Sequence, residues 1–363
     1  MTQLNIALVG FGFMGSMHAQ IYAQLSGAKL VGIADPRVDL VMAKQQRLGL
    51  HVPVYRSLTE LLRAQPGTEM VDLCTPLDAH EADALVVVQS GRHLFCEKPL
   101  APTLAAADRI IAAAKAAGVM AQVGHCIRFW PEYQALRQFV RDDVGGRLLS
   151  LSLARQSSRP DYTVDNWANE EGRSGGAALD LHIHDTDFVL ALLGAPQAVH
   201  SRAVFDYSGP SHIFTLYDYP EIAVSAEGGW NYPPKWGFRM AFQAVFEKAC
   251  IDFDSTKSPM LTVTWNEGTP EPLAFEQPDA GKSQSGDGNI SNLGGYFNEL
   301  QAFVKSILQG VPPTDATLED ARASLEVVFA EIESARAQRP IARGVRHEKV
   351  DQHLVLPHKA FAR

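Results

Sequence analysis

A glycine-rich loop near the amino terminus follows the apolar run Ile6–Val9 and precedes a helical pattern over residues 16–25. Strand, tight glycine turn and helix, in this order, can seat the pyrophosphate of a dinucleotide on a helix N-terminus. Gly10 would permit the sharp turn, Gly12 would let the backbone approach the phosphates, and Gly15 would let the helix pack close to the strand. The predicted cofactor-binding residues of this loop are Gly10, Phe11, Gly12, Phe13, Met14 and Gly15.

Length and composition limit the classes of protein to consider. A chain of 363 residues suggests two domains of roughly 150 residues each, and a 46% hydrophobic, 20% charged composition is typical of a globular protein. The net charge of −9 argues against nucleic acid as the main partner. We expect no membrane span, because no apolar run reaches about 18 residues. The amino terminus lacks a basic signal region and the four cysteines are scattered, so the cytoplasm is the expected compartment.

The first 124 residues alternate short apolar runs with helical patterns, which predicts a parallel sheet with helices on both faces. The expected strands are Asn5–Val9, Lys29–Ala34, Met70–Thr75, His93–Cys96 and Val119–Val123. The expected helices are Gly15–Leu25, Val38–Leu48, Leu58–Arg63, Asp78–Ser90 and Leu104–Ala117.

The pattern changes after residue 124, where longer alternating runs predict a second, largely antiparallel sheet with one open face. Its expected strands are Leu148–Arg155, Val199–Phe205, Ser211–Asp218, Ile222–Gly228, Arg239–Glu247, Ala249–Asp254 and Met260–Trp265. Helices are expected at Trp130–Arg141, His184–Leu193, Gly295–Leu308 and Leu318–Arg336. We expect Gln277–Ser291 to form a surface loop and Gly344–Arg363 to form a tail that docks on a neighbouring subunit. The predicted fold class is α/β, with a Rossmann domain over 1–124 and an α+β substrate and oligomerisation domain over 125–363.

Asp35 ends the second expected strand, at the place where an acidic residue binds the adenosine ribose hydroxyls of a dinucleotide. A carboxylate there repels a 2′-phosphate, which favours NAD over NADP. Arg37 weakens this preference, because it could pair with that phosphate, so NADP is also possible. The alternative interpretation is an ordinary turn aspartate before Pro36.

Other candidates follow later strands of the first sheet, where open α/β sheets bind their ligands. Thr75 and Pro76, with His80 close behind, would line the cofactor, unless they form an ordinary strand-to-helix turn. Pro99 restricts the backbone of Lys98, which would direct that lysine into the cleft, with Glu97 reaching the nicotinamide ribose. Taken in isolation, a Glu-Lys pair is usually a solvated surface pair.

The densest polar stretch of the chain is Gly175–Asp187. Asp180 and His184 are four residues apart and would share a helix face, where a carboxylate can raise the basicity of an imidazole and orient it for acid–base work. A metal site of His182, His184 and Asp187 is less favoured, because histidines two apart do not share a helix face. We therefore expect no metal. A purely structural role for both histidines is a further alternative.

Taken together and in this order, the glycine loop, Cys74-Thr75-Pro76, Glu97-Lys98-Pro99-Leu100 and Asp180…His184 resemble the glucose–fructose oxidoreductase/inositol dehydrogenase/rhizopine catabolism (Gfo/Idh/MocA) family. Gly228-Gly229-Trp230 and Tyr296…Glu299…Phe303 are similar to the second domain of that family. The resemblance extends from Asn5 to about Arg336. It implies NAD(P)-dependent oxidation or reduction of a sugar, cyclitol or related polyol, with Lys98, Asp180 and His184 facing the substrate. It also implies homodimers or homotetramers built through the open sheet face.

The hypothesis that follows makes His184 the acid/base and Lys98 the group that stabilises a developing alkoxide. Arg128 belongs to a segment that resembles one entering the cleft of the family, and Trp167 is the best candidate for a sugar-stacking surface, although aromatic residues are more often core. Three alternatives stay open: a sugar lyase or hydrolase that uses tightly bound NAD for transient oxidation, a reductase of biliverdin-like or imine substrates, and a non-catalytic NAD-binding regulator.

Overall fold

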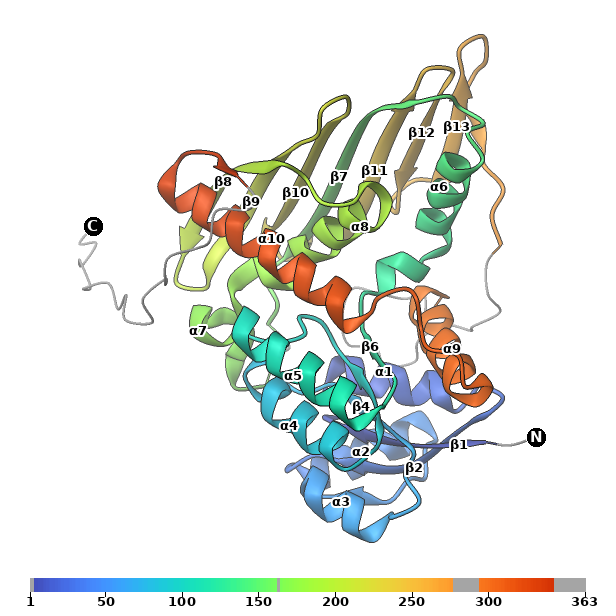
Figure 1. The fold of residues 1–363 in the computed structure, drawn as a ribbon, viewed down its shortest axis with the longest axis vertical. Coiled ribbons are helices and arrows are strands. Elements are labelled where there is room, and N and C mark those ends of the chain that lie inside the picture. The colour runs from blue at the N-terminus through green and yellow to red at the C-terminus, as the bar shows by residue number, and fades with distance from the viewer. Residues whose placement is uncertain (1–2, 162–163, 277–293, 343–363) are drawn as a thin grey trace.

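The computed structural model describes residues 3–161, 164–276 and 294–342. Its first unit, in the lower half of Figure 1, is a six-stranded sheet of order β3-β2-β1-β4-β5-β6 in which every pair is parallel. The strands are β1 (Leu4–Val9), β2 (Ala28–Ala34), β3 (Val54–Tyr55), β4 (Met70–Leu73), β5 (His93–Cys96) and β6 (Ala121–Val123). The helices are α1 (Phe13–Tyr22), α2 (Val38–Leu48), α3 (Leu58–Ala64), α4 (Leu77–Gln89) and α5 (Leu104–Ala117).

Local signals explain where these elements begin and end. The hydroxyl of Thr103 accepts a hydrogen bond from the backbone N–H of Ala106, and the following helix ends at Gly118, whose φ is +65°. The helix α2 ends in the same way, at Gly49 with φ +67°. The predicted bounds of α2 and α5 are therefore confirmed. The two-residue strand β3 was not predicted, because it is too short to show an alternation.

The second unit is a nine-stranded sheet of order β14-β13-β12-β11-β7-β10-β9-β8-β15. Only the central β7–β10 pair is parallel among its described pairs. The strands are β7 (Leu148–Ser158), β8 (Ala198–Asp206), β9 (Gly209–Asp218), β10 (Ala223–Tyr232), β11 (Phe238–Phe246), β12 (Ala249–Asp254), β13 (Leu261–Trp265), β14 (Glu271–Pro272) and β15 (Ile341–Ala342). The predicted mostly antiparallel sheet is confirmed.

Helices of this unit cover one face of the nine-stranded sheet, with α8 and α10 lying across it in Figure 1. The α-helices are α6 (Pro131–Arg141), α7 (Glu171–Ser174), α8 (Ile183–Leu193), α9 (Gly294–Gln309) and α10 (Leu318–Ala337), with short 3-10 helices at Cys126–Phe129 and Val164–Asn169 and a π-helix at Ala178–His182. The opposite face carries exposed side chains such as Phe214 and Leu216. This is the open face that the sequence predicts.

The carboxy-terminal helices join the two units. Leu325 of α10 belongs to the same apolar cluster as Ile110 of α5, and the rings of Phe303 on α9 and Phe95 on β5 lie 6.0 Å apart. The chain leaves the first sheet at the end of β6, at Val123, and packing between the two units continues beyond that point.

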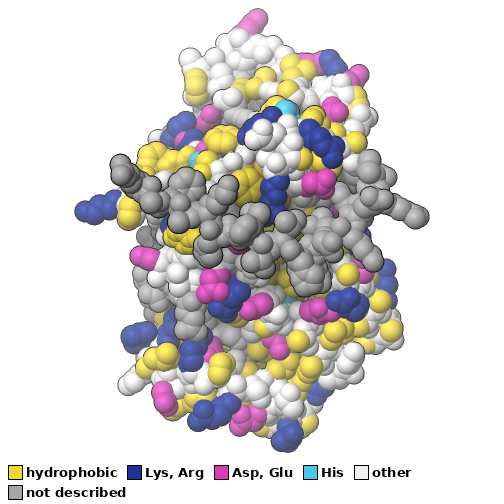
Figure 2. Space-filling view, turned by 90° about the vertical axis from the view of Figure 1, so that its left-hand side faces the viewer, with side chains coloured by type: hydrophobic (Ala, Val, Ile, Leu, Met, Phe, Trp, Pro, Cys, Tyr) yellow, Lys and Arg dark blue, Asp and Glu magenta, His cyan; other side chains and the backbone are white. Residues whose placement is uncertain are grey.

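Several sequence-based expectations concern the surface. The predicted loop Gln277–Ser291 and the predicted docking tail Gly344–Arg363 lie outside the described residues. Within the described part of the chain, every helix is too short or too polar to cross a membrane. On the face shown in Figure 2, basic and acidic side chains are interspersed, and its described residues form no single broad basic area.

Candidate active site

A cavity of about 650 Å³ lies beyond the carboxyl ends of the first sheet and is closed by residues of the second unit. A ligand cavity in an open α/β sheet is expected at this edge. From the first unit its lining includes Gly10, Gly12, Phe13, Met14, Asp35, Arg37, Thr75, Pro76, Glu97 and Lys98. From the second unit it includes Arg155, Trp167, Asp180, His184 and Trp230. Most residues predicted for cofactor and substrate thus surround one space.

The glycine loop is shaped as its sequence predicts. Gly10 has φ +85°, and a Cβ there would lie 2.5 Å from the carbonyl oxygen of Cys74. A Cβ on Gly15 would lie 1.9 Å from the carbonyl oxygen of Gly10, so this glycine lets α1 pack against the turn. A Cβ on Gly12 would meet nothing within 4 Å, because this residue borders the cavity at the N-terminus of α1. An anionic group fits this place, where backbone N–H groups and the helix dipole converge.

Asp35 is buried at the end of β2 and is held by its neighbours. Its Oδ2 accepts a hydrogen bond from the backbone N–H of Phe11 at 3.0 Å and from Arg37 Nη2 at 2.7 Å. Its Oδ1 accepts the backbone N–H and Nε of Arg37, both at 2.9 Å. Burial opposes ionisation, but these donors outweigh it and hold the pKa of Asp35 below its ordinary value. The carboxylate therefore borders the cavity as one half of an ion pair.

Lys98 reaches across the cavity to the second unit. It follows β5 and Glu97, and its Nζ donates hydrogen bonds to Oδ1 of Asp180 at 3.0 Å and to the carbonyl oxygen of Asp180 at 2.8 Å. The lysine side chain is 13% exposed and the aspartate 32%. Because an ammonium group has three donors, one N–H of Lys98 is left for a ligand in the cavity.

Asp180 lies in the π-helix Ala178–His182, directly before α8, which carries His184. Such π turns are frequent at functional sites. The carboxylate of Asp180 is bonded to Lys98 and does not contribute to the pKa shift of His184, so the expectation that Asp180 raises the basicity of His184 is wrong. Burial, Lys98 and Arg155 instead lower the pKa of His184 well below its ordinary value. The imidazole is therefore neutral near pH 7.

The burial of its two ring nitrogens shows which nitrogen of His184 can contact a ligand. Its Nδ1 is buried and has no hydrogen-bond partner among the described residues. The residue is 8% exposed and lines the cavity, which leaves Nε2 as the nitrogen that faces it. A neutral imidazole with an accessible nitrogen is suited to accept a proton from a hydroxyl group.

Arg155 is a cavity residue that the sequence analysis did not single out. Its Nε and Nη2 donate to the two carboxylate oxygens of Asp185 at 3.1 and 3.0 Å, and both side chains are buried. A signal was present, because an arginine interrupts the inward-facing positions of the long strand β7 and an aspartate directly follows His184. Trp230, one of the aromatic residues considered as a sugar-stacking surface, lines the same cavity as Trp167.

Four predicted residues do not line the cavity. Phe11 and Gly15 shape the loop from behind, and His80 is buried, with its two ring nitrogens 2.8 Å from the carbonyl oxygens of Pro99 and Thr75. Arg128 was expected to bind substrate, but its guanidinium is buried in a bidentate ion pair with Asp187 at 2.7 and 2.8 Å. Its geometry corrects that expectation, since the donors that would face a substrate are occupied.

The residues of the disfavoured metal interpretation do not converge. His182 Nε2 lies 3.1 Å from a carboxylate oxygen of Glu331, whereas the carboxylate of Asp187 binds Arg128. His184 faces the cavity instead. Each group thus has a different set of partners.

Comparison with known proteins shows that two models of one protein family match this chain. A family model described as "Oxidoreductase family, NAD-binding Rossmann fold" matches residues 4–125, and the "GFO/IDH/MocA C-terminal domain" matches residues 133–251. The scyllo-inositol 2-dehydrogenase (NAD(+)) of Bacillus subtilis (strain 168) is 30% identical over 95% of this chain and 97% of its own length. The myo-inositol 2-dehydrogenase of Thermotoga maritima is 25% identical over 93% and 98%. A levoglucosan dehydrogenase structure in complex with NADH and levoglucosan has a TM-score of 0.78 at 21% identity, covering 94% and 99% of the two chains.

Proposed function

The chain belongs to the Gfo/Idh/MocA family of NAD-dependent oxidoreductases, and from that premise we propose that it moves a hydride between nicotinamide and a secondary alcohol or ketone of a sugar, cyclitol or sugar derivative. The observation that carries the proposal is the Lys98–Asp180 pair, which borders the same cavity as His184 and the glycine loop. The relatives named inositol and levoglucosan dehydrogenases support the choice of substrate class.

The residues present fit a dinucleotide. Gly12, Phe13 and Met14 at the N-terminus of α1 would hold the pyrophosphate, and Asp35 with Arg37 would meet the adenosine ribose. The nicotinamide half would lie toward Thr75, Pro76, Glu97 and Lys98. When bound, NAD would supply the hydride acceptor or donor, and side chains would transfer the proton, stabilise the alkoxide and position the substrate.

In the proposed mechanism, Nε2 of His184 accepts the proton of the substrate hydroxyl in the oxidative direction and returns it in the reductive direction. The free N–H of Lys98 stabilises the developing alkoxide, as a preorganised donor does in a site that excludes water. Asp180 holds Lys98 in place and has a second carboxylate oxygen for a substrate hydroxyl. Trp167 and Trp230 give the sugar an apolar wall.

A His184→Ala variant tests the acid–base assignment. We expect its kcat to fall by about 10²–10⁴-fold, because that is the usual contribution of a positioned acid–base group. Binding of NAD, measured by calorimetry on the purified chain, should be unchanged. The substrate for this assay comes from screening sugars and inositols with NAD and NADP at the NADH absorbance band. Unchanged turnover in the variant would exclude His184 as the acid/base.

A second function is favoured by particular relatives. The 2,7-anhydro-N-acetylneuraminate hydratase of Escherichia coli (strain K12) is 27% identical over 53% of this chain and 50% of its own length. A lyase or hydratase that oxidises its substrate transiently would purify with bound NAD and convert substrate without net NADH. The same screen, with product detection by mass spectrometry, separates the two functions.

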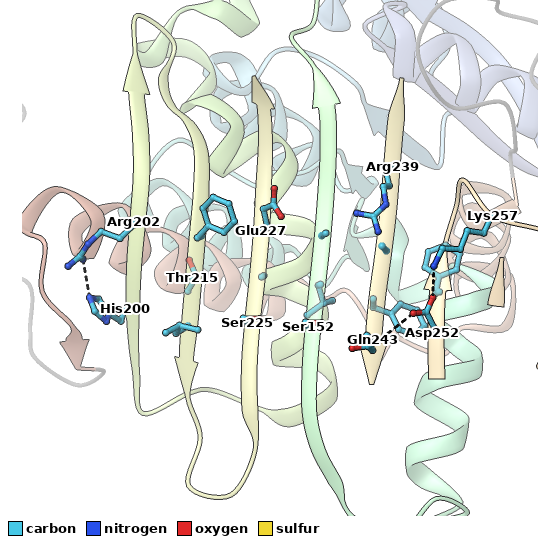
Figure 3. A pocket seen from close by; sticks show the side chains of 18 residues that line it. Ser152, His200, Arg202, Thr215, Ser225, Glu227, Arg239, Gln243, Asp252 and Lys257 are labelled. Carbon is cyan, nitrogen blue, oxygen red and sulfur yellow. Dashed lines mark hydrogen bonds and ion pairs between the residues drawn. The ribbon is translucent and has the colours of Figure 1, made fainter. Parts of the chain in front are cut away.

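We also propose that the open face of the nine-stranded sheet binds a second copy of the chain. A cavity of about 620 Å³ on this face, shown in Figure 3, is lined by side chains from adjacent strands. Phe214 and Leu216 are 53% and 59% exposed there, and Glu227, which accepts hydrogen bonds from His212 and Gln156, lies beside them. A Leu216→Glu variant should dissociate a dimer or tetramer in size-exclusion chromatography with light scattering.

The cytoplasmic location stays a prediction.

A further inference from the structure

A cluster of buried polar side chains lies behind the cavity and has no role in the mechanism above. His18 belongs to α1, the helix that begins in the glycine loop, and Asp72 belongs to β4. Both are fully buried, and Glu97, which borders the cavity after β5, is 5% exposed. The cluster therefore connects the helix of the glycine loop to the strand end that carries Lys98.

The ring of His18 lies between two carboxylates. Its Nδ1 is 2.8 Å from Oδ2 of Asp72, and its Nε2 is 3.2 Å from Oε1 of Glu97. Nδ1 is hydrogen-bonded to Asp72, whereas Nε2 and Oε1 of Glu97 make a close ion-pair contact without the alignment of a hydrogen bond. Burial disfavours the imidazolium, but the Asp72 carboxylate beside Nδ1 raises the pKa of His18 above its ordinary value. Tyr22 also donates its hydroxyl to Oδ2 of Asp72, at 2.8 Å.

Atoms of His18, Asp72 and Cys74 lie within 4.8 Å of one another, which would permit a metal site. Hydrogen bonds within the cluster account for the proximity of these groups. The thiol of Cys74 donates to Oδ1 of Asp72 at 3.4 Å, and Nδ1 of His18 lies 2.8 Å from Oδ2 of Asp72. Burial raises the pKa of the thiol.

The carboxylate of Glu97 is fixed from several sides. While Oε1 meets His18, Oε2 accepts the backbone N–H of Lys98 at 3.2 Å. A Cβ on Gly124 would lie 2.9 Å from Oε1, so a side chain at position 124 would displace this group. Each carboxylate oxygen keeps a further lone pair. Glu97 can thus accept hydrogen bonds from the cavity while its orientation is fixed from behind.

We propose that His18 is a positioning residue for the nicotinamide half of the cofactor: through its Nε2 it fixes Glu97 so that the carboxylate accepts hydrogen bonds from ribose hydroxyls. This inference rests on the proposed role of Glu97. It makes one helix serve both halves of the cofactor, because α1 meets the pyrophosphate at its first turn and the ribose through His18. Asp72 and Tyr22 hold the imidazolium in place.

A matched pair of substitutions separates the two nitrogens of His18. In His18→Asn the amide nitrogen is near the Nδ1 position, which keeps the bond to Asp72 and loses Glu97. In His18→Gln the amide nitrogen is near the Nε2 position and can still reach Glu97. Calorimetry on the full chain with NAD and with ADP, which lacks the second ribose, gives the readout. We expect His18→Asn to weaken NAD binding about tenfold, because the ion-pair contact that holds Glu97 is lost, with ADP binding unchanged and His18→Gln closer to wild type.

Two further variants define the outcomes. If Glu97→Gln binds NAD as wild type does, the proposed role of Glu97 is wrong. If Glu97→Gln weakens NAD and His18→Asn does not, the inference is overturned while that role stands. Equal weakening of NAD and ADP in His18→Asn would also overturn it, by indicating a structural role. Gly124→Ala displaces Glu97 without touching His18, so an unchanged affinity for NAD in this variant would show that the position of Glu97 does not matter and would remove the premise of the inference.

Discussion

Two ion pairs of the same chemical type flank His184 and differ in their surroundings. Lys98–Asp180 borders the cavity, with side chains 13% and 32% exposed. Arg128–Asp187 lies within the protein, with side chains 5% and 1% exposed. Each pair joins segments that are far apart in the sequence, and both aspartates belong to the same helical region. Neither the spacing along the chain nor the acidic partner therefore tells the cavity pair from the buried pair.

Saturation of the hydrogen bonds distinguishes the two pairs. Arg128 also binds Asp315 at 2.9 Å and Asp320 at 3.1 Å, and the Ser324 hydroxyl donates to Asp187. Lys98 keeps one donor for a ligand. A charged side chain whose hydrogen bonds all go to other protein groups stabilises the fold. A charged side chain that keeps an unused N–H donor facing a cavity can act on a substrate. Substitutions should therefore affect stability at one pair and turnover at the other.

The largest effect is expected at the buried pair. Arg128→Met should lower the free energy of unfolding by about 3–5 kcal/mol, because it leaves the Asp187 carboxylate buried without its main partner. Chemical denaturation of the purified chain measures this. Arg137→Met is the matched control, since this arginine is 25% exposed and also binds Asp315; its loss should be at most about 1 kcal/mol. Equal losses in the two variants would show that saturation does not matter.

The cavity pair should give the opposite result. Lys98→Met is expected to lower kcat by about 10²–10³-fold, because it removes the donor aimed at the developing alkoxide. Its free energy of unfolding should change by no more than about 1 kcal/mol, since Asp180 is exposed enough to be solvated. Steady-state kinetics and the same denaturation experiment test both parts. A Lys98→Met chain with full activity, or one as unstable as Arg128→Met, would contradict the comparison.

Much of the fold could be predicted because its elements carry local signals. The helices Val38–Leu48 and Leu104–Ala117 have the expected bounds, and each ends at a glycine of positive φ. The strand Val54–Tyr55 has no such signal and was missed. The position of Lys98 at a strand end was sufficient to place it in the cavity, because the carboxyl edge of a parallel sheet is where ligands bind.

The partners of the site residues could not be predicted. Spacing along a helix suggested that Asp180 meets His184, but its partner is Lys98, 82 residues away. Arg128 was expected in the cleft, but its partner Asp187 is 59 residues away. Such contacts depend on how the two sheets pack, which no local pattern encodes. The neutral state of His184 has the same origin, since burial and Lys98 lower its pKa.

The lowered pKa of His184 should make the free energy of unfolding depend on pH. The unfolded chain binds a proton at this residue near pH 6.5, whereas the folded chain does so only at lower pH. Its contribution to stability is therefore complete above pH 6.5 and is lost as the pH falls. His184→Asn should reduce the slope of unfolding free energy against pH between about 6.5 and 5, by at most about 1.4 kcal/mol per pH unit. An unchanged slope would mean that His184 is already protonated in the folded chain.

Arg37–Asp35 is an intermediate case, because the arginine is 33% exposed and the aspartate 2%. The aspartate also accepts the backbone N–H groups of Phe11 and Arg37, so it keeps donors when the guanidinium is lost. Arg37→Gln should then change stability by less than about 1 kcal/mol. It should also weaken NADP relative to NAD by a few-fold, because a less neutralised carboxylate repels a 2′-phosphate more strongly. Binding of both cofactors by calorimetry tests this, and a shift toward NADP would mean that Arg37 does not shield Asp35.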